Sequence, residues 1–220
     1  KTNELMVWKK YYKSHKVIPN IDLEDLDLNT IFKQRKNFYH SAGLSISNLK
    51  DKTFLELAPG TGYNAFYLLQ NEVKRVDLVD FNDEAIKKIK INLKKFKGKF
   101  SIYKRDIDKF TTKKKYDYVM IENALFNLKN PSKTLIKLFK FVKKNGFIII
   151  TTSDQYSLFS EKLRGLVAHL LLSKKNYLKK SFNEKSKLLS SFFKSHLKKL
   201  NTKTRSSSKW VEDNILHYDG

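Results

Sequence analysis

Cysteine is absent from the 220 residues, and no apolar run reaches the length of a membrane-spanning helix, about 18 residues or more. The lack of cysteine excludes a disulfide framework and a thiolate metal site, so we expect no metal ion and take the cytoplasm as the default location. The first ten residues have the pattern of neither a signal peptide nor a transit peptide. The sequence therefore predicts a protein without a transmembrane segment.

Arginine is scarce as well. Only five of the 45 basic residues are arginine, and the rest are lysine. The formal net charge of +23 would ordinarily indicate nucleic acid or an anionic membrane as a partner. However, arginine is the side chain that binds phosphates and bases through paired hydrogen bonds, so its scarcity weakens that inference. Nucleic acid stays an alternative partner and not the first expectation.

A hydrophobic share of 40% is enough for a buried core, and the length suits one domain with an appendage. Between residues 50 and 152, short apolar runs alternate with helical patterns. We predict strands over 54–57, 75–80, 100–103, 116–121 and 147–152, and helices that start at Asn64, Asp83 and Pro131, the last of them running through Val142. Strands separated by helices specify a parallel sheet with right-handed crossovers, so the sequence predicts a doubly wound α/β core.

A glycine turn, residues 58–62, follows the first strand. Its two glycines, Gly60 and Gly62, let the backbone turn sharply and let a ligand approach the main chain. The free N–H groups of the helix that follows add donors and a partial positive charge. No lysine ends the turn, which excludes a phosphate-binding P-loop. A dinucleotide site remains a rival, because Gly60 to Ala65 matches the permissive G-x-G-x-x-G/A pattern.

Four acids lie at the ends of four successive predicted strands: Glu56, Asp80, Asp106 and Glu122. Ligands of open α/β sheets bind outside the carboxyl ends of the strands, so we expect these side chains to converge on one crevice. Four carboxylates do not suit a nucleoside triphosphate. They suit a ligand that carries positive charge.

The glycine turn and the spaced acids together resemble the class I S-adenosylmethionine-dependent methyltransferases. The resemblance covers about residues 50 to 152 and includes Tyr116 to Asn123 at the fourth strand. An acid four residues before Gly60 favours this family over dehydrogenases. Ala58 is a departure, because the family usually has its first glycine there. The resemblance implies a Rossmann-like methyltransferase fold with a doubly wound, mainly parallel sheet.

The resemblance also implies S-adenosylmethionine as cofactor and S-adenosylhomocysteine as product. Asp80 would accept hydrogen bonds from the ribose hydroxyls, and Phe81 would lie against the adenine ring. The Asp106 carboxylate and the Ile107 N–H would hold the adenine edge, and Glu56 with the glycine turn would hold the methionine portion. The predicted cofactor residues are Tyr39, Glu56, Ala58, Pro59, Gly60, Gly62, Asn64, Asp80, Phe81, Asp106, Ile107 and Glu122.

Methyl transfer is an in-line displacement, so a general base is needed only for a protonated, weakly acidic acceptor. The candidates for that role are His40, Asn123, Asp154 and Tyr156, whereas we interpret His169 as a packed core histidine. The fourth strand lacks the Asn/Asp-Pro-Pro-aromatic signature of enzymes that methylate amino groups of bases or glutamine. That difference favours a small-molecule acceptor.

The flanking segments are predicted to be helical. In residues 1–49 we expect one helix over about 1–16 and a second from Asn29 to about Gly43, which would cover the cofactor site. Residues 153–220 are predicted to form a helical cap, with helices over 160–172 and about 189–200. Trp210 to Leu216 reads as either a strand or a helix.

The family's sheet usually has two further strands after the fifth, and none is evident before Gly220. Either the chain is truncated or helices replace those strands. The fifth strand would then lie at an edge that a homodimer would cover.

Three functions follow from these observations. The first is an S-adenosylmethionine-dependent methyltransferase that acts on a small molecule. The second keeps the cofactor and makes RNA the acceptor, with the basic segment from Lys174 to Lys203 as its electrostatic footprint. The third is a non-catalytic interaction module with the same fold.

Overall fold

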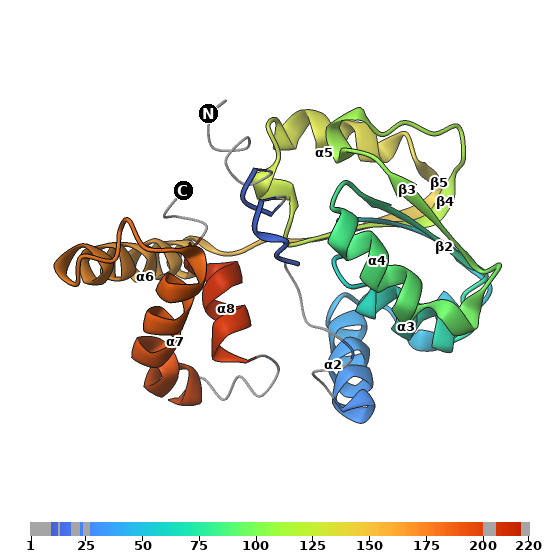
Figure 1. The fold of residues 1–220 in the computed structure, drawn as a ribbon. Coiled ribbons are helices and arrows are strands. Elements are labelled where there is room, and N and C mark those ends of the chain that lie inside the picture. The colour runs from blue at the N-terminus through green and yellow to red at the C-terminus, as the bar shows by residue number, and fades with distance from the viewer. Residues whose placement is uncertain (1–9, 13, 19–22, 24–26, 200–205, 217–220) are drawn as a thin grey trace. The chain divides into compact units, whose positions relative to one another are not determined.

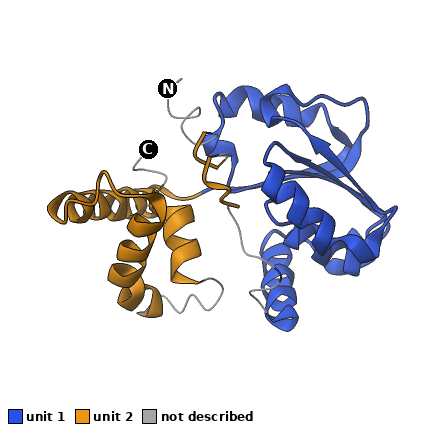
Figure 2. Cartoon of the chain, in the orientation of Figure 1, with its two compact units in different colours: residues 1, 21–152 blue, residues 2–20, 153–220 orange. Residues whose placement is uncertain are grey.

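The computed structural model describes residues 10–12, 14–18, 23, 27–199 and 206–216 (Figure 1). The chain divides into two compact units, coloured in Figure 2: unit 1 is residues 1 and 21–152, and unit 2 is residues 2–20 and 153–220. Unit 1 ends where the sequence predicts the end of the α/β core. The described residues Tyr11 and Val17, which we expected among the N-terminal covering helices, pack in the core of unit 2 instead.

Unit 1 is built on a five-stranded, all-parallel sheet with the strand order β3-β2-β1-β4-β5. The strands are β1 (Thr53–Leu57), β2 (Arg75–Asp80), β3 (Phe100–Lys104), β4 (Tyr116–Glu122) and β5 (Val142–Thr151). The predicted doubly wound α/β fold is confirmed. The strand order reverses direction next to β1, and crevices for ligands form at such a switch point.

Helices cover both faces of the sheet, as Figure 1 shows. They are α2 (Leu28–Ser41), α3 (Tyr63–Gln70), α4 (Asp83–Asn92) and α5 (Pro131–Phe139), with short 3₁₀ turns η2 (Ile46–Leu49), η3 (Lys94–Phe96), η4 (Ile107–Lys109) and η5 (Leu125–Asn127). Alternate residues of β1 enter different cores, because successive side chains of a strand point to opposite faces. Phe54 packs with residues of α2, α3 and α4, whereas Leu55 packs with Leu138 of α5.

Asn29 and Asp83, which we expected as the N-caps of two helices, lie inside α2 and α4. Asp27, not Asn29, caps α2 and accepts a hydrogen bond from the Thr30 N–H at 3.1 Å. Asn82, not Asp83, caps α4, because its side-chain oxygen accepts from the backbone N–H groups of Glu84 and Ala85. In each case an earlier polar residue reaches the free N–H groups of the first turn. The predicted stop of α2 at Gly43 agrees with the left-handed φ of +75° at that residue.

β5 begins earlier than predicted. Residues 142–146, expected as the end of a helix and a loop, belong to the strand. Tyr116 pairs with Val142 and Tyr118 with Phe147, so β5 carries extra residues in an irregular stretch of pairing. Pairing with β4 therefore outweighs the helical pattern of Val142. Within the described residues no strand follows β5, which is an edge strand of this sheet.

Unit 2 contains α6 (Gln155–Lys174), α7 (Phe182–Lys199) and α8 (Ser207–Asn214), and its described residues 10–12 and 14–15 are helical as well. Most of the segment from Trp210 to Leu216 is therefore helical. The core of unit 2 includes Leu172, Leu189 and Val211, one each from α6, α7 and α8. None of the described helices is both long enough and apolar enough to cross a bilayer.

Candidate functional site

The glycine turn leads from β1 into α3 through three residues with left-handed backbone. Ala58, Gly60 and Gly62 have φ values of +55°, +57° and +76°. A Cβ at Gly62 would lie 3.2 Å from Cγ1 of Ile89, so close packing of α4 adds to the need for glycine there. Ala58 adopts the same backbone region with a Cβ, at a cost of about 1–2 kcal/mol. This left-handed geometry explains why the family usually has glycine at this position. Ala58 adopts the same geometry under strain.

Glu56 lies in β1 beneath this turn and is only 3% exposed. Its Oε2 atom is one of four buried side-chain N or O atoms that lack a hydrogen-bond partner in the described part of the chain. Burial and, to a lesser extent, the nearby Glu122 raise the pKa of Glu56 to about 8 against the opposing effect of Arg35. A buried carboxylate with a free oxygen is suited to a cationic ligand group.

Arg35 of α2 is the centre of a buried hydrogen-bond network. Its Nη1 donates to both carboxylate oxygens of Glu122 at 3.0 Å and to the Tyr63 hydroxyl at 2.9 Å. Its Nη2 donates to Oδ1 of Asn64 at 2.7 Å, and the guanidinium carbon lies 4.3 Å from the centre of the Phe38 ring. The Nε atom has no partner. Arg35 therefore ties α2 to α3 and to the end of β4.

Tyr39 and Asn64 complete the wall beside Glu56, and both are fully buried. The Tyr39 hydroxyl donates to Oδ1 of Asn64 at 2.8 Å, and Nδ2 of Asn64 lies 3.3 Å from Sδ of Met120. Burial raises the pKa of the Tyr39 hydroxyl, so it stays protonated as a donor. Among the predicted cofactor residues, Tyr39, Glu56, Asn64 and Glu122 are thus brought together around Arg35.

Asp80 ends β2 and is 7% exposed. Its carboxylate accepts from the Asn82 N–H at 2.8 Å. Burial raises the pKa of Asp80 to about 6, although hydrogen bonds from the backbone N–H groups of Asn82, Phe81 and Gly60 oppose the shift. The bond from Gly60 joins Asp80 to the glycine turn, and Phe81 beside it is half-buried.

Asp106 and Ile107 lie at the start of η4, after β3. The Asp106 carboxylate is half-buried and accepts from the Asp108 N–H at 3.0 Å as the cap of that turn. Ile107 is buried, and its carbonyl accepts from Nζ of Lys137 at 2.6 Å. This end of the site is held by local bonds and by α5.

The four candidates for a general base do not form one group. Asn123 has a left-handed φ of +51°, and its side-chain oxygen accepts from the Thr151 hydroxyl at 3.0 Å. His40 is exposed on α2. Asp154 and Tyr156 belong to unit 2, where Asp154 caps α6 and Tyr156 is 76% exposed. The interpretation of His169 as a core histidine is wrong, since its side chain is exposed on α6.

Tyr63 belongs to this network and, like Arg35, is not among the predicted cofactor residues. It is the first residue of α3, it lies directly after Gly62, and its hydroxyl lies 3.3 Å from Oε1 of Glu122. A tyrosine directly after the second glycine was the only sequence signal. In the described residues no group of three or more His, Cys, Asp or Glu side chains is arranged to hold a metal ion.

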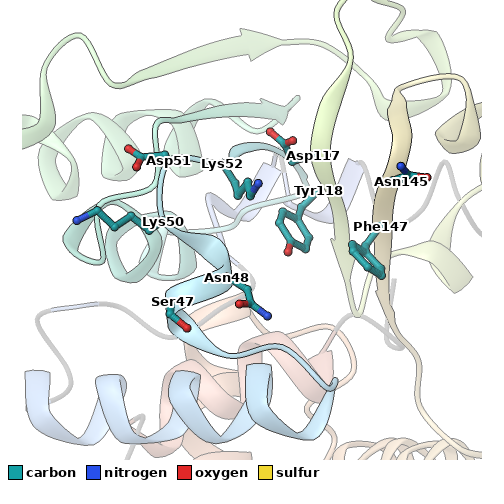
Figure 3. Close-up of a pocket in the computed structure, with 9 residues that line it drawn as sticks. All are labelled: Ser47, Asn48, Lys50, Asp51, Lys52, Asp117, Tyr118, Asn145 and Phe147. Carbon is teal, nitrogen blue, oxygen red and sulfur yellow. The ribbon is translucent and has the colours of Figure 1, made fainter.

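A separate pocket of about 580 Å³ lies near the amino ends of β1 and β4 (Figure 3). The acids predicted to bind the cofactor lie near the carboxyl ends of the strands and do not line it. Tyr118 and Phe147 form one wall as a stacked pair, with ring centres 5.6 Å apart. The Asp117 carboxylate at its rim accepts hydrogen bonds from the Thr53 hydroxyl and from Nζ of Lys143. None of the predicted site residues lines this pocket, whose lining is Ser47, Asn48, Lys50, Asp51, Lys52, Asp117, Tyr118, Asn145 and Phe147.

Comparisons with known proteins agree with this geometry. The family described as "Methyltransferase domain" matches residues 48–210. The N-methyltransferase NodS from Bradyrhizobium japonicum, solved with S-adenosylhomocysteine, is 18% identical with a TM-score of 0.50, and the match covers 66% of this chain and 71% of NodS. No curated protein sequence matches the chain.

Two further solved structures match parts of the chain. Phosphoethanolamine N-methyltransferase 1 from Haemonchus contortus is 17% identical with a TM-score of 0.51, over 68% of this chain and 31% of that one. PH1948 from Pyrococcus horikoshii, a candidate RNA methyltransferase, is 23% identical with a TM-score of 0.44, over 61% of this chain and 66% of that one. The chain thus spans less than two thirds of the length of either protein.

Proposed function

This chain belongs to the methyltransferase domain family, and we propose that it transfers the methyl group of S-adenosylmethionine to a small-molecule acceptor. The observation that carries the proposal is the buried carboxylate of Glu56, with its unpartnered oxygen, at the glycine turn that also binds Asp80. A methyltransferase site needs to hold a cationic cofactor in a dry pocket, and a buried acid with a free oxygen fits that need.

The residues present fit the cofactor at both ends. Glu56 Oε2 is available to accept from the ammonium group, and Arg35 Nε is available to donate to the carboxylate of the methionine portion. We assign the ribose hydroxyls to Asp80, and the adenine ring to Phe81, Asp106 and the Ile107 N–H. When bound, the cofactor supplies a methyl group on a positively charged sulfur.

The contribution of the chain is alignment and exclusion of water. The network of Arg35, Asn64, Tyr39 and Glu122 is buried or half-buried and fixes the side chains that surround Glu56. Preorganised polar groups of this kind lower the cost of reaching a reactive geometry. We do not assign a general base, because His40 and Tyr156 are exposed, the Asn123 side chain is held by a hydrogen bond from Thr151, and Asp154 is held as the cap of α6.

The small-molecule acceptor is supported by Glu122-Asn123-Ala124-Leu125 at the end of β4, which differs from the signature of enzymes that methylate amino groups of bases. The cytoplasm remains our proposed location, from the absence of cysteine. A homodimer that covers the edge of β5 also remains a proposal.

Calorimetry with S-adenosylmethionine and S-adenosylhomocysteine tests the cofactor assignment. Replacing Asp80 with asparagine keeps one acceptor oxygen for the backbone N–H groups of the turn and removes the charge. We expect Asp80→Asn to weaken binding at least about tenfold, since bonds to charged groups contribute roughly 1.5–3 kcal/mol. Asp83→Asn is the control, because Asp83 is exposed and pairs with Lys104 at the surface. Absence of binding to the parent protein would refute the assignment.

A labelled methyl group tests catalysis and the acceptor class. The parent protein should transfer label from S-adenosylmethionine into the small-molecule fraction of a cell extract. Label in an RNase-sensitive fraction would instead favour the RNA alternative, in which case substrate binding should weaken steeply with salt. Binding of the cofactor with no transfer to any fraction would favour a non-catalytic module.

A further inference from the structure

α6 carries an exposed apolar stripe along one side. We define the α6 stripe as Tyr156, Phe159, Leu163, Leu166, Val167 and Leu170, whose exposed fractions run from 37% to 76%. At 3.6 residues per turn, these six side chains fall within an arc of about 100°. Figure 2 shows α6 within unit 2.

The other side of α6 is already occupied. Gly165, Ala168 and Leu172 are buried, and the last two pack in the core of unit 2 with residues of α7 and α8. α6 is therefore apolar on two sides, and the described residues of unit 2 cover only one of them. A contiguous exposed apolar surface marks an interaction site, so we expect the α6 stripe to have a partner.

The charge around the stripe indicates the kind of partner. Residues 153–199 contain eleven lysines and arginines and only three acids. Lys162 lies beside the stripe, Lys174 continues it one turn after Leu170, and Lys175 and Lys179 follow, all of them exposed. Apolar and aromatic side chains on one face with lysines at its border are typical of helices that lie in the surface of an anionic bilayer.

We propose that the α6 stripe docks unit 2 onto an anionic membrane surface. The helix has 20 residues, so it extends about 30 Å, and it would lie parallel to the surface with Tyr156 and Phe159 at the level of the headgroups. A second copy of the chain fits this stripe less well, because the exposed lysines that border the stripe would face those of the other copy. RNA also fits less well, because aliphatic leucines offer it no stacking surface, and Arg164, the only arginine of residues 153–199, is directed at the Trp210 ring.

Flotation of the full chain with lipid vesicles tests the proposal. We expect binding to vesicles of phosphatidylcholine mixed with phosphatidylserine, and at least about tenfold weaker binding to phosphatidylcholine alone. The variant Phe159→Ser/Leu166→Ser should reduce binding to the mixed vesicles at least about tenfold. The matched control is Ile136→Ser/Phe139→Ser, since these residues of α5 are each 65% exposed and should leave vesicle binding unchanged.

The electrostatic part is tested separately by Lys174→Gln/Lys175→Gln/Lys179→Gln, which should lower the preference for phosphatidylserine. Three results would overturn the proposal: equal vesicle binding by the parent and the stripe variant, a dimer in solution that the stripe variant dissociates, or RNA binding that the stripe variant abolishes. Circular dichroism confirms that each variant is folded. Cofactor binding, measured by calorimetry, should be the same for all of them, so failure here is distinct from failure of the proposed function.

Discussion

The two ends of the candidate cofactor site are built in different ways. At the methionine end, Arg35 joins Glu122, which is 87 residues away in the chain, to Asn64 and Tyr63, and Glu56 lies buried beside them. At the adenine end, Asp106 is half-buried and bonds to the N–H of a residue only two positions away. One end depends on tertiary packing and the other on local turns. Stability and cofactor binding should therefore be coupled at the methionine end and separable at the adenine end.

The largest effect is expected at Arg35. Replacing it with alanine leaves the Glu122 carboxylate and the buried Asn64 oxygen without their shared donor, which should lower the free energy of unfolding by about 3–5 kcal/mol. Urea denaturation measures the change. Arg35→Lys keeps the positive charge but lacks the two separate nitrogens that bond to Glu122 and to Asn64. The free energy of unfolding of Arg35→Lys should therefore fall by an intermediate amount.

Lys36 provides the control for that experiment, because it is exposed on the same helix. Lys36→Ala should change stability by less than about 0.5 kcal/mol. If Arg35→Ala were as stable as Lys36→Ala, the network would not hold the methionine end together.

Glu56 should oppose folding and favour binding. Burial raises the pKa of Glu56 to about 8, so between pH 4.5 and 8 the folded chain keeps a proton that the unfolded chain releases. The contribution of Glu56 to the free energy of unfolding is therefore most favourable below pH 4.5. It falls as the pH rises and is lost above about pH 8, where the buried side chain must ionise. Glu56→Gln removes this loss and should raise the free energy of unfolding by about 1–3 kcal/mol above pH 8, with little difference near pH 4.5.

The same substitution should weaken S-adenosylmethionine binding about tenfold above pH 8, because a neutral amide replaces a carboxylate that is ionised there. Urea titrations at several pH values and calorimetry give the two readouts. Glu72→Gln is the control for stability, since Glu72 is exposed and pairs with Lys50. A variant with the pH dependence of the parent would contradict the buried, protonated state of Glu56.

A smaller effect is expected at Ala58, in the turn that joins the two ends. Because its φ is +55°, Ala58→Gly should relieve backbone strain and raise the free energy of unfolding by about 0.5–1 kcal/mol, after the entropic cost of glycine. Ala58→Val should instead destabilise the protein, since a branched side chain is more strained in that region. Thermal denaturation of both variants gives the sign of each change in stability. A loss of stability in Ala58→Gly would contradict backbone strain at Ala58.

The same contrast explains what the sequence could predict. The five strands, the glycine turn and the acids Asp80, Asp106 and Glu122 follow from local patterns, and the structure confirms that the five strands form one parallel sheet. The hydrogen bonds of Arg35 could not be predicted, because they reach Tyr63 and Glu122, which lie far away in the chain. Val142 followed a helical pattern, yet pairing with Tyr116 places it in β5. At Val142 a tertiary contact thus overrode local preference.

The smallest effect on stability is expected at Asp106, where the adenine end can be changed alone. Asp106→Asn keeps an oxygen that accepts from the Asp108 N–H, so the cap of η4 should survive and the free energy of unfolding should change by less than about 0.5 kcal/mol. Binding of S-adenosylhomocysteine should nevertheless weaken by about threefold to tenfold, because an ionised acceptor is lost. Calorimetry and urea denaturation on the same preparation measure both quantities. If this variant lost as much stability as Arg35→Lys, the adenine end would be as tightly coupled to folding as the methionine end, and the contrast between them would fail.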